Sequence, residues 1–315
     1  GAAGSVIAAI GDVTGANTDG VGGVVRITGS DNDQTNARAS CITATTKSYR
    51  SFAGILVDMG GNGGIIMLDT SCTNITFSEC VIGGVVAAAD GQVYVRGASQ
   101  ANITFDGCLF NGCGSNSLIF THSADVDNTG HVVQNCLFLG PATSSTTAAI
   151  SIANVGGITI KNSGFLMCAY AVYITAALAA GQTVTVNNCL LMGCGNGLRA
   201  ATLGEIVENY NAVHCCATAR TNVATGANSN AYPWLQDWRW FLELTNGGRI
   251  VSPYDLVSYS TLLNVAGTSP TTTDMRGTSV QGAQREWGAL EYDSTLLVEG
   301  AGGGMLKAEK RGGKQ

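Results

Sequence analysis

The feature that most constrains the fold is an eight-residue unit that recurs along the chain. The unit alternates apolar and polar residues, continues with a turn-like pair and a small residue, and ends on an apolar pair. Its six copies are ITFSECVI (75–82), ITFDGCLF (103–110), HVVQNCLF (131–138), ITIKNSGF (158–165), VTVNNCLL (184–191) and the weaker IVENYNAV (206–213). The sixth position of the unit advances in steps of 28, 28, 27, 26 and 22 residues.

A period of two within each unit is typical of a β-strand with alternate residues facing inward. One such strand per coil buries little, whereas stacked coils bury a continuous core and pair their backbones at a spacing of ~4.8 Å. The repeat therefore predicts an all-β, right-handed parallel β-helix of about eight coils of 22–28 residues. The signature of leucine-rich repeats is missing, and propeller blades are longer. Residues 24–28, 41–45, 54–58 and 65–69 are predicted to be further strands.

Asn135, Asn162 and Asn188 align at the fifth position of the unit. Asparagine tolerates the left-handed backbone conformation better than most residues do. We therefore expect a turn at this position.

The cysteines follow the repeat. The chain has 11 of them, an odd number that does not suit a disulfide framework. Eight fall into two columns five residues apart, Cys80, Cys108, Cys136 and Cys189 in the first and Cys113, Cys168, Cys194 and Cys216 in the second. These are predicted to be buried, reduced core residues, which favours folding in a reducing compartment.

A zinc site is the alternative interpretation of some of these cysteines. Cys108 with Cys113 and Cys189 with Cys194 have Cys-x4-Cys spacing, and residues 214–216 read His-Cys-Cys. Zinc ligands usually come as two close pairs, and the repeat already accounts for these positions. No metal or other cofactor is predicted.

The chain divides into four predicted parts. Residues 1–20 form an N-terminal arm or cap, residues 21–231 the β-helix, residues 232–295 a tryptophan-rich C-terminal capping segment, and residues 296–315 a glycine-rich basic tail. In the tail, Lys307, Lys310, Arg311 and Lys314 are predicted to contact a partner, because the chain as a whole is acidic with a net charge of −6. The alternative is that the tail folds back on its own column.

Composition excludes some partners. No basic stripe of the kind that nucleic-acid binding requires is visible in the body of the chain. The longest apolar run, residues 169–180, is shorter than the ~20 residues that span a bilayer. Neither nucleic acid nor a membrane is a predicted partner.

A catalytic site would need two facing carboxylates, as in glycoside hydrolysis. The candidates are Glu79 and Asp106, interpreted as outward residues at equivalent positions of adjacent coils. The next coils carry Gln134, Lys161 and Asn187 there, so the acidic row does not continue. Glu205 and Glu208 are interpreted as solvated loop charges. We expect no glycosidase or lyase activity.

Two parts of the chain resemble a known group of proteins. The stretches ENYN (208–211), ARTNV (219–223) and GANS (226–229) resemble the exit from the coils in right-handed β-helix proteins of tailed phages and of environmental bacteria such as planctomycetes. DMRG (274–277) followed by WGALEY (287–292) resembles the closing motif of that group. The resemblance implies a β-helix and favours a structural protein of a phage, although fold does not fix function.

The sequence thus favours a non-catalytic structural protein of a large assembly, a phage virion component such as a capsid decoration or tail-associated protein. Its expected location is the virion, assembled in the host cytoplasm. Its expected partners are further copies of the chain, for example in a trimer, and other structural proteins of the assembly. The alternative is a secreted or cell-surface β-helix that binds or cleaves polysaccharides, with glycans as partners.

Overall fold

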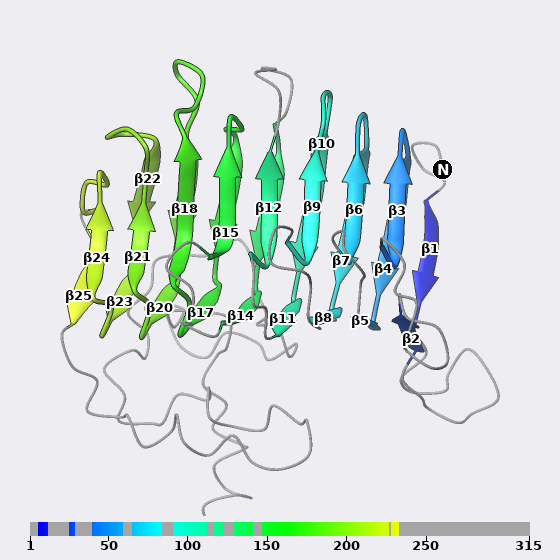
Figure 1. The fold of residues 1–315 in the computed structure, drawn as a ribbon, viewed down its shortest axis with the longest axis horizontal. Coiled ribbons are helices and arrows are strands. Elements are labelled where there is room, and N and C mark those ends of the chain that lie inside the picture. Colours follow the sequence, from blue (N-terminus) through cyan, green and yellow to red (C-terminus); the bar gives the residue numbers. More distant parts are fainter. Residues whose placement is uncertain are drawn as a thin grey trace, which may run out of the picture.

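The structure, a computed structural model, describes residues 6–11, 25–28, 40–58, 65–83, 91–111, 116–121, 129–140, 147–226 and 228–232. The regular elements of this part of the chain are all β-strands. They lie side by side along one axis and form a parallel β-helix (Figure 1). The predicted segment 232–295, apart from its first residue Tyr232, and the predicted segment 296–315 lie outside the described residues, and so do Lys307, Lys310, Arg311 and Lys314.

Three parallel sheets build the column, and each coil gives one strand to each sheet. The first sheet contains β1 (Ile7–Ile10), β4 (Ser48–Ala53), β7 (Thr73–Ser78), β10 (Ala101–Asp106), β13 (His131–Gln134), β16 (Ile158–Lys161), β19 (Val184–Asn187) and β22 (Ile206–Asn209). The second contains β2 (Val25–Thr28), β5 (Ile55–Asp58), β8 (Val81–Gly83), β11 (Leu109–Asn111), β14 (Leu137–Leu139), β17 (Gly164–Leu166), β20 (Leu190–Met192), β23 (Ala212–His214) and β25 (Asn230–Tyr232). The third contains β3 (Ile42–Thr45), β6 (Ile66–Asp69), β9 (Val93–Arg96), β12 (Leu118–Thr121), β15 (Ala148–Ala153), β18 (Tyr170–Ala176), β21 (Asn196–Arg199) and β24 (Thr218–Thr221).

The register between coils is the one that the repeat predicts. Along the first sheet, paired positions run through Thr76, Thr104, Val132, Thr159, Thr185 and Val207. The four additional strands expected near the N-terminus are confirmed within one residue as β2, β3, β5 and β6. The strands of the third sheet had no counterpart in the repeat unit.

The first coil differs from the predicted length. β1 pairs with β4 so that Ala8 lies opposite Ser51, a longer step than any later one, and β1 falls within the segment 1–20 that was predicted to be an arm or cap. Solenoid coils accept extra residues in the connections between strands without losing register, because only the strands take part in the stacking.

A ladder of phenylalanines fills the core and changes sheets halfway along the column. In the first sheet, Phe52 stacks on Phe77 and Phe77 on Phe105, with ring centroids 4.8 and 5.2 Å apart. Phe105 meets Phe110 of the second sheet edge to face at 5.9 Å. The ladder then continues through Phe138 and Phe165 at 4.4 and 4.9 Å. Where one sheet carries a ring, the other carries a smaller residue in all coils but one, which keeps the packing dense.

The turn between the first and second sheets confirms the expectation for the asparagines. Asn135, Asn162 and Asn188 have φ values of 54°, 50° and 54°, in the left-handed region. In the other three copies of the repeat unit, Glu79, Gly107 and Tyr210 take the same position, with φ values of 52°, 63° and 53°. Asparagine and glycine adopt this conformation at low cost, whereas glutamate and tyrosine do so less readily.

Candidate functional site

Glu79 and Asp106, the two predicted catalytic candidates, do not occupy equivalent positions. β10 pairs with β7 so that Asp106 lies opposite Ser78, and the Glu79 N–H donates to the Asp106 carbonyl oxygen at 2.9 Å. Glu79 instead occupies the left-handed turn, where its side chain is exposed. The expected equivalence is wrong by one residue, because the strand ends at Ser78 and the turn begins with Glu79. Gln134, Lys161 and Asn187 do follow Asp106 in register, as predicted.

The Asp106 carboxylate accepts hydrogen bonds from the next coil. Its Oδ2 accepts a hydrogen bond from Gln134 Nε2 and its Oδ1 one from Asn135 Nδ2, both at 2.8 Å. Since both oxygens are engaged, this carboxylate ties two coils together at the turn.

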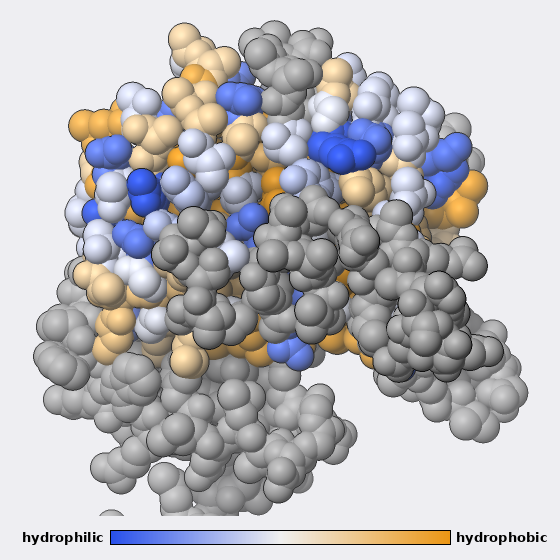
Figure 2. Space-filling model, viewed as in Figure 1, coloured by the Kyte–Doolittle hydropathy of each residue, from blue (hydrophilic) through white to orange (hydrophobic). Residues whose placement is uncertain are grey.

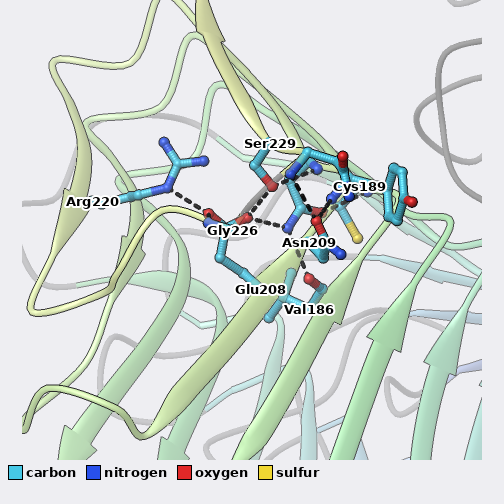
Figure 3. Close-up of polar contacts among 10 residues, drawn as sticks. Val186, Cys189, Glu208, Asn209, Arg220, Gly226 and Ser229 are labelled. Atoms are coloured by element: carbon cyan, nitrogen blue, oxygen red, sulfur yellow. Dashed lines mark hydrogen bonds and ion pairs between the residues drawn. The ribbon is translucent and has the colours of Figure 1, made fainter.

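A buried carboxylate that the sequence interpretation placed in a solvated loop lies at the end of the core (Figure 3). Glu208, in β22, is 5% exposed. Its Oε1 accepts hydrogen bonds from Arg220 Nε at 2.8 Å and from the Gly226 N–H at 2.7 Å. Its Oε2 accepts from Asn211 Nδ2 at 2.7 Å and from the Ser229 hydroxyl at 2.5 Å. Four donors therefore saturate this carboxylate.

The register explains how Glu208 and Arg220 meet. Glu208 pairs with Val186, and Arg220 of β24 pairs with Leu198, so both stand at positions that are apolar core in the preceding coil. Their side chains are 0% and 9% exposed. In the sequence, the sign of this pair is a charged residue at a position of the strand that faces inward.

Burial by itself opposes ionisation of Glu208. The hydrogen bonds from Arg220, Ser229, the Gly226 N–H and Asn211 outweigh it, and they hold the pKa of this carboxyl below its ordinary value. Glu208 is therefore ionised and paired at neutral pH.

Glu205 was also interpreted as a solvated loop charge, and that interpretation is wrong. The residue is 8% exposed, and its Oε1 and Oε2 accept hydrogen bonds from the backbone N–H groups of Leu178 and Thr202, both at 2.7 Å. The carboxylate closes the connection between β21 and β22, and it joins that connection to the coil before.

Most of the predicted cysteine columns lie in the core. Cys80, Cys108, Cys136, Cys168, Cys189 and Cys194 are buried free thiols, Cys216 is half-buried, and Cys113 lies outside the described residues. A shared contact repeats along both columns, because each thiol reaches a backbone carbonyl oxygen of the coil before it. Examples are Cys108 to Phe77 at 3.4 Å and Cys194 to Phe165 at 3.6 Å.

Burial suppresses the reactivity of these thiols. It raises the pKa of Cys189 to about 12. A hydrogen bond from one column member to the next adds to this effect and raises the pKa of Cys80, through Cys108, far above the ordinary range. Since the thiolate is the reactive form, Cys80 and Cys189 are unreactive in the folded protein.

His214 lies next to the half-buried Cys215 and Cys216, the other two residues of the alternative zinc-site interpretation. The imidazole is 1% exposed, and burial lowers its pKa to about 4. Within the described ranges, no three His, Cys, Asp or Glu residues are placed to hold a metal ion.

A second polar cluster, on the third sheet, was missed by the sequence interpretation. Tyr170 and Tyr173 stack at a centroid distance of 4.7 Å, and the Arg199 guanidinium lies over both rings, 5.5 and 4.8 Å from their centroids. Arg199 Nη1 also donates to the Tyr170 hydroxyl at 3.0 Å. Tyr173 and Arg199 are half-buried and remain accessible. The tyrosines lie in an apolar run that gave no sign of facing outward.

The surface shows hydrophilic groups interspersed with apolar ones on the face seen in Figure 2. In the part of the chain that the structure describes, no helix has the length and apolar character needed to cross a membrane. Searches against protein-family models, curated proteins and solved structures find no match to this chain.

Proposed function

We propose that the protein is a non-catalytic structural component of a large assembly, a phage virion component such as a capsid decoration or tail-associated protein. The observation that carries the proposal is the contrast between the two ends of the column. Within the described residues, the N-terminal end exposes apolar side chains on a strand that pairs on one side only, whereas at the other end a buried ion pair occupies core positions.

At the N-terminal end, Ile7 and Ile10 of β1 are 57% and 63% exposed, and Val25 of β2 is 42% exposed. β1 is the first strand of its sheet and, within the described residues, pairs on one side only, with β4. An open edge with exposed apolar residues is a template for association with another chain. This arrangement suits a subunit that docks by one end on further copies or on another structural protein.

At the other end, the Glu208–Arg220 pair occupies core positions. Inward-pointing charges are a known device against edge-to-edge association. The residues of this network, Glu208, Asn211, Arg220, Gly226 and Ser229, come from the three stretches whose resemblance to phage β-helix proteins suggests a virion component.

Sedimentation of the full chain tests the docking end. Ile7→Lys with Ile10→Lys should shift the protein from oligomer to monomer, since two charges would then occupy the association surface. Leu203→Lys is the matched control, because Leu203 is 69% exposed but lies away from β1. A monomeric parent chain that also fails to bind particles would contradict the proposal.

The basic tail is tested separately. Deletion of residues 301–315 should weaken oligomerisation or particle docking, and the effect should be smaller at high salt, where screening has already weakened the charge contacts of the parent chain. Thermal stability should stay nearly unchanged. Electron microscopy of a purified assembly, with the chain labelled, would identify the particle.

The alternative function, binding or cleavage of polysaccharides at the cell surface or outside the cell, is favoured by the cluster of Tyr170, Tyr173 and Arg199. Aromatic rings give a stacking surface, and a guanidinium recognises carboxylates. Binding of acidic polysaccharides that is lost in Arg199→Ala and in Tyr173→Ala would support it.

A further inference from the structure

We infer that the segment following β25, beginning at residue 233, docks along the outer face of the second sheet. The outer face carries an apolar stripe that runs along the column from β8 to β20. Its buried members are Leu109, Leu137, Leu166 and Met192, and its half-buried members are Val81, Leu139 and Leu190.

These residues face away from the core. They alternate along their strands with core residues, as Leu109 does with Phe110 and Leu166 with Phe165. The strands β8, β11, β14, β17 and β20 stand next to one another in the sheet, so the stripe is continuous.

The stripe is covered although it belongs to an outer surface. Leu109 and Met192 are 8% exposed, and Leu137 and Leu166 are 3% exposed. The described members of this cluster all come from strands of the second sheet, and a single sheet face does not bury its own residues so completely. His214 is a further sign that this outer face is covered. It pairs with Met192 in the neighbouring strand, on the same outer face, and is only 1% exposed.

The place where the chain leaves the column, after β25, indicates which segment covers the stripe. β25 is the last strand of the second sheet and pairs with β23, so the chain leaves the column at the end of this face. From β25 to β11 is five strand spacings, roughly 24 Å, which about seven extended residues can span. Three large apolar residues lie within that reach, Trp234, Leu235 and Trp238, and four more follow directly, Trp240, Phe241, Leu242 and Leu244.

Lateral docking differs from the capping role predicted for residues 232–295. A cap would cover the end of the last coil, whereas this segment would run back along several coils. Each coil that it contacts would then be fastened to its neighbours by a second layer.

Tryptophan emission gives a clean readout, because all four tryptophans, at positions 234, 238, 240 and 287, lie in the segment after β25. In the full chain, Leu166→Asp should shift the emission to the red and raise quenching by acrylamide toward the level of the unfolded chain. Thr159→Asp is the matched control: it places the same charge on a half-buried position of the neighbouring strand β16, outside the stripe. This control should leave emission and quenching as in the parent chain.

Circular dichroism verifies that each variant keeps its strands. If Leu166→Asp does not fold, the double variant Leu137→Ala with Leu166→Ala removes contacts without adding charge, and it should raise quenching to an intermediate level. Unchanged emission in folded variants would overturn the inference. So would dissociation of an oligomer by Leu166→Asp without a change in emission, because a second copy would then be the occupant.

Discussion

The Glu208 carboxylate and the Arg220 guanidinium meet at 2.8 Å inside the last described coil, at positions where the coil before has Val186 and Leu198. A paired charge thus replaces two apolar side chains at the point where the core ends. Such a pair contributes little net stability compared with apolar residues, but each charge is costly once its partner is removed.

Arg220→Ala should therefore destabilise the protein by about 3–5 kcal/mol, because it leaves a buried carboxylate without its cation. The double change Glu208→Val with Arg220→Leu restores the residues of the preceding coil and should be far milder, or neutral. Urea unfolding of the variants measures this. We also expect the double variant to associate more readily, since its last coil would present an apolar end. A double variant as unstable as Arg220→Ala would contradict this account.

His214 should make stability depend on pH between about 6.5 and 4. Its folded pKa is depressed to about 4, so the unfolded chain takes up the proton first as the pH falls. The free energy of unfolding therefore has its full value from His214 above pH 6.5. It falls on acidification, and the loss reaches about 3 kcal/mol at pH 4. His214→Gln should flatten the unfolding free energy across this window.

Glu208 should make stability depend on pH in a lower range than His214 does. Its folded pKa lies below the ordinary 4.5, so its stabilising effect is present above pH 4.5 and is lost as the pH falls through the folded value. Below pH 4.5, Glu208→Gln should lose less stability on further acidification than the parent chain does, as followed by thermal unfolding. An identical acid profile would show that the carboxylate does not lose its bonds there.

The left-handed turns should accept glycine better than alanine. Asn162 has a φ of 50° and its Oδ1 accepts a hydrogen bond from Asn188 Nδ2 at 3.3 Å. Asn162→Ala should cost about 1–2 kcal/mol from the conformation alone, and Asn162→Gly less. Asn187, which lies in β19 with strand conformation, is the control position, where alanine should be preferred to glycine. The opposite order at Asn162 would contradict the turn assignment.

The buried thiols should resist modification in the folded protein. Cys41 and Cys215 are half-buried and should react first with a thiol reagent, whereas the buried column members should react only after unfolding. Cys216 is half-buried, but its hydrogen bond with Cys194 and its burial raise its pKa, so it should react more slowly than Cys41 and Cys215. Thiol counting with and without denaturant, together with metal analysis, tests this. Bound zinc, or a large deficit of free thiols in denaturant, would disprove the interpretation of the columns.

Much of the fold could be predicted because the repeat encodes the register. Positions one coil apart in the sequence are neighbours in space, so the steps of the first cysteine column give the pairing of the first sheet from β7 to β22. The asparagine turns and the stacked thiols follow from the same alignment, because each is a column of the repeat.

The tertiary structure decided what the repeat does not encode. The third sheet beyond β6, the long first coil and the choice of Arg220 as the partner of Glu208 depend on connections that vary from coil to coil. The alignment of copies shows only that Glu208 stands at an inward position. Glu79 shows the same limit, because a one-residue change from strand to turn separated it from Asp106. The sequence by itself determined which residues stack, because stacking repeats at a nearly constant spacing. Only the folded chain decided which side chains meet across the coil, because that depends on the path of each turn.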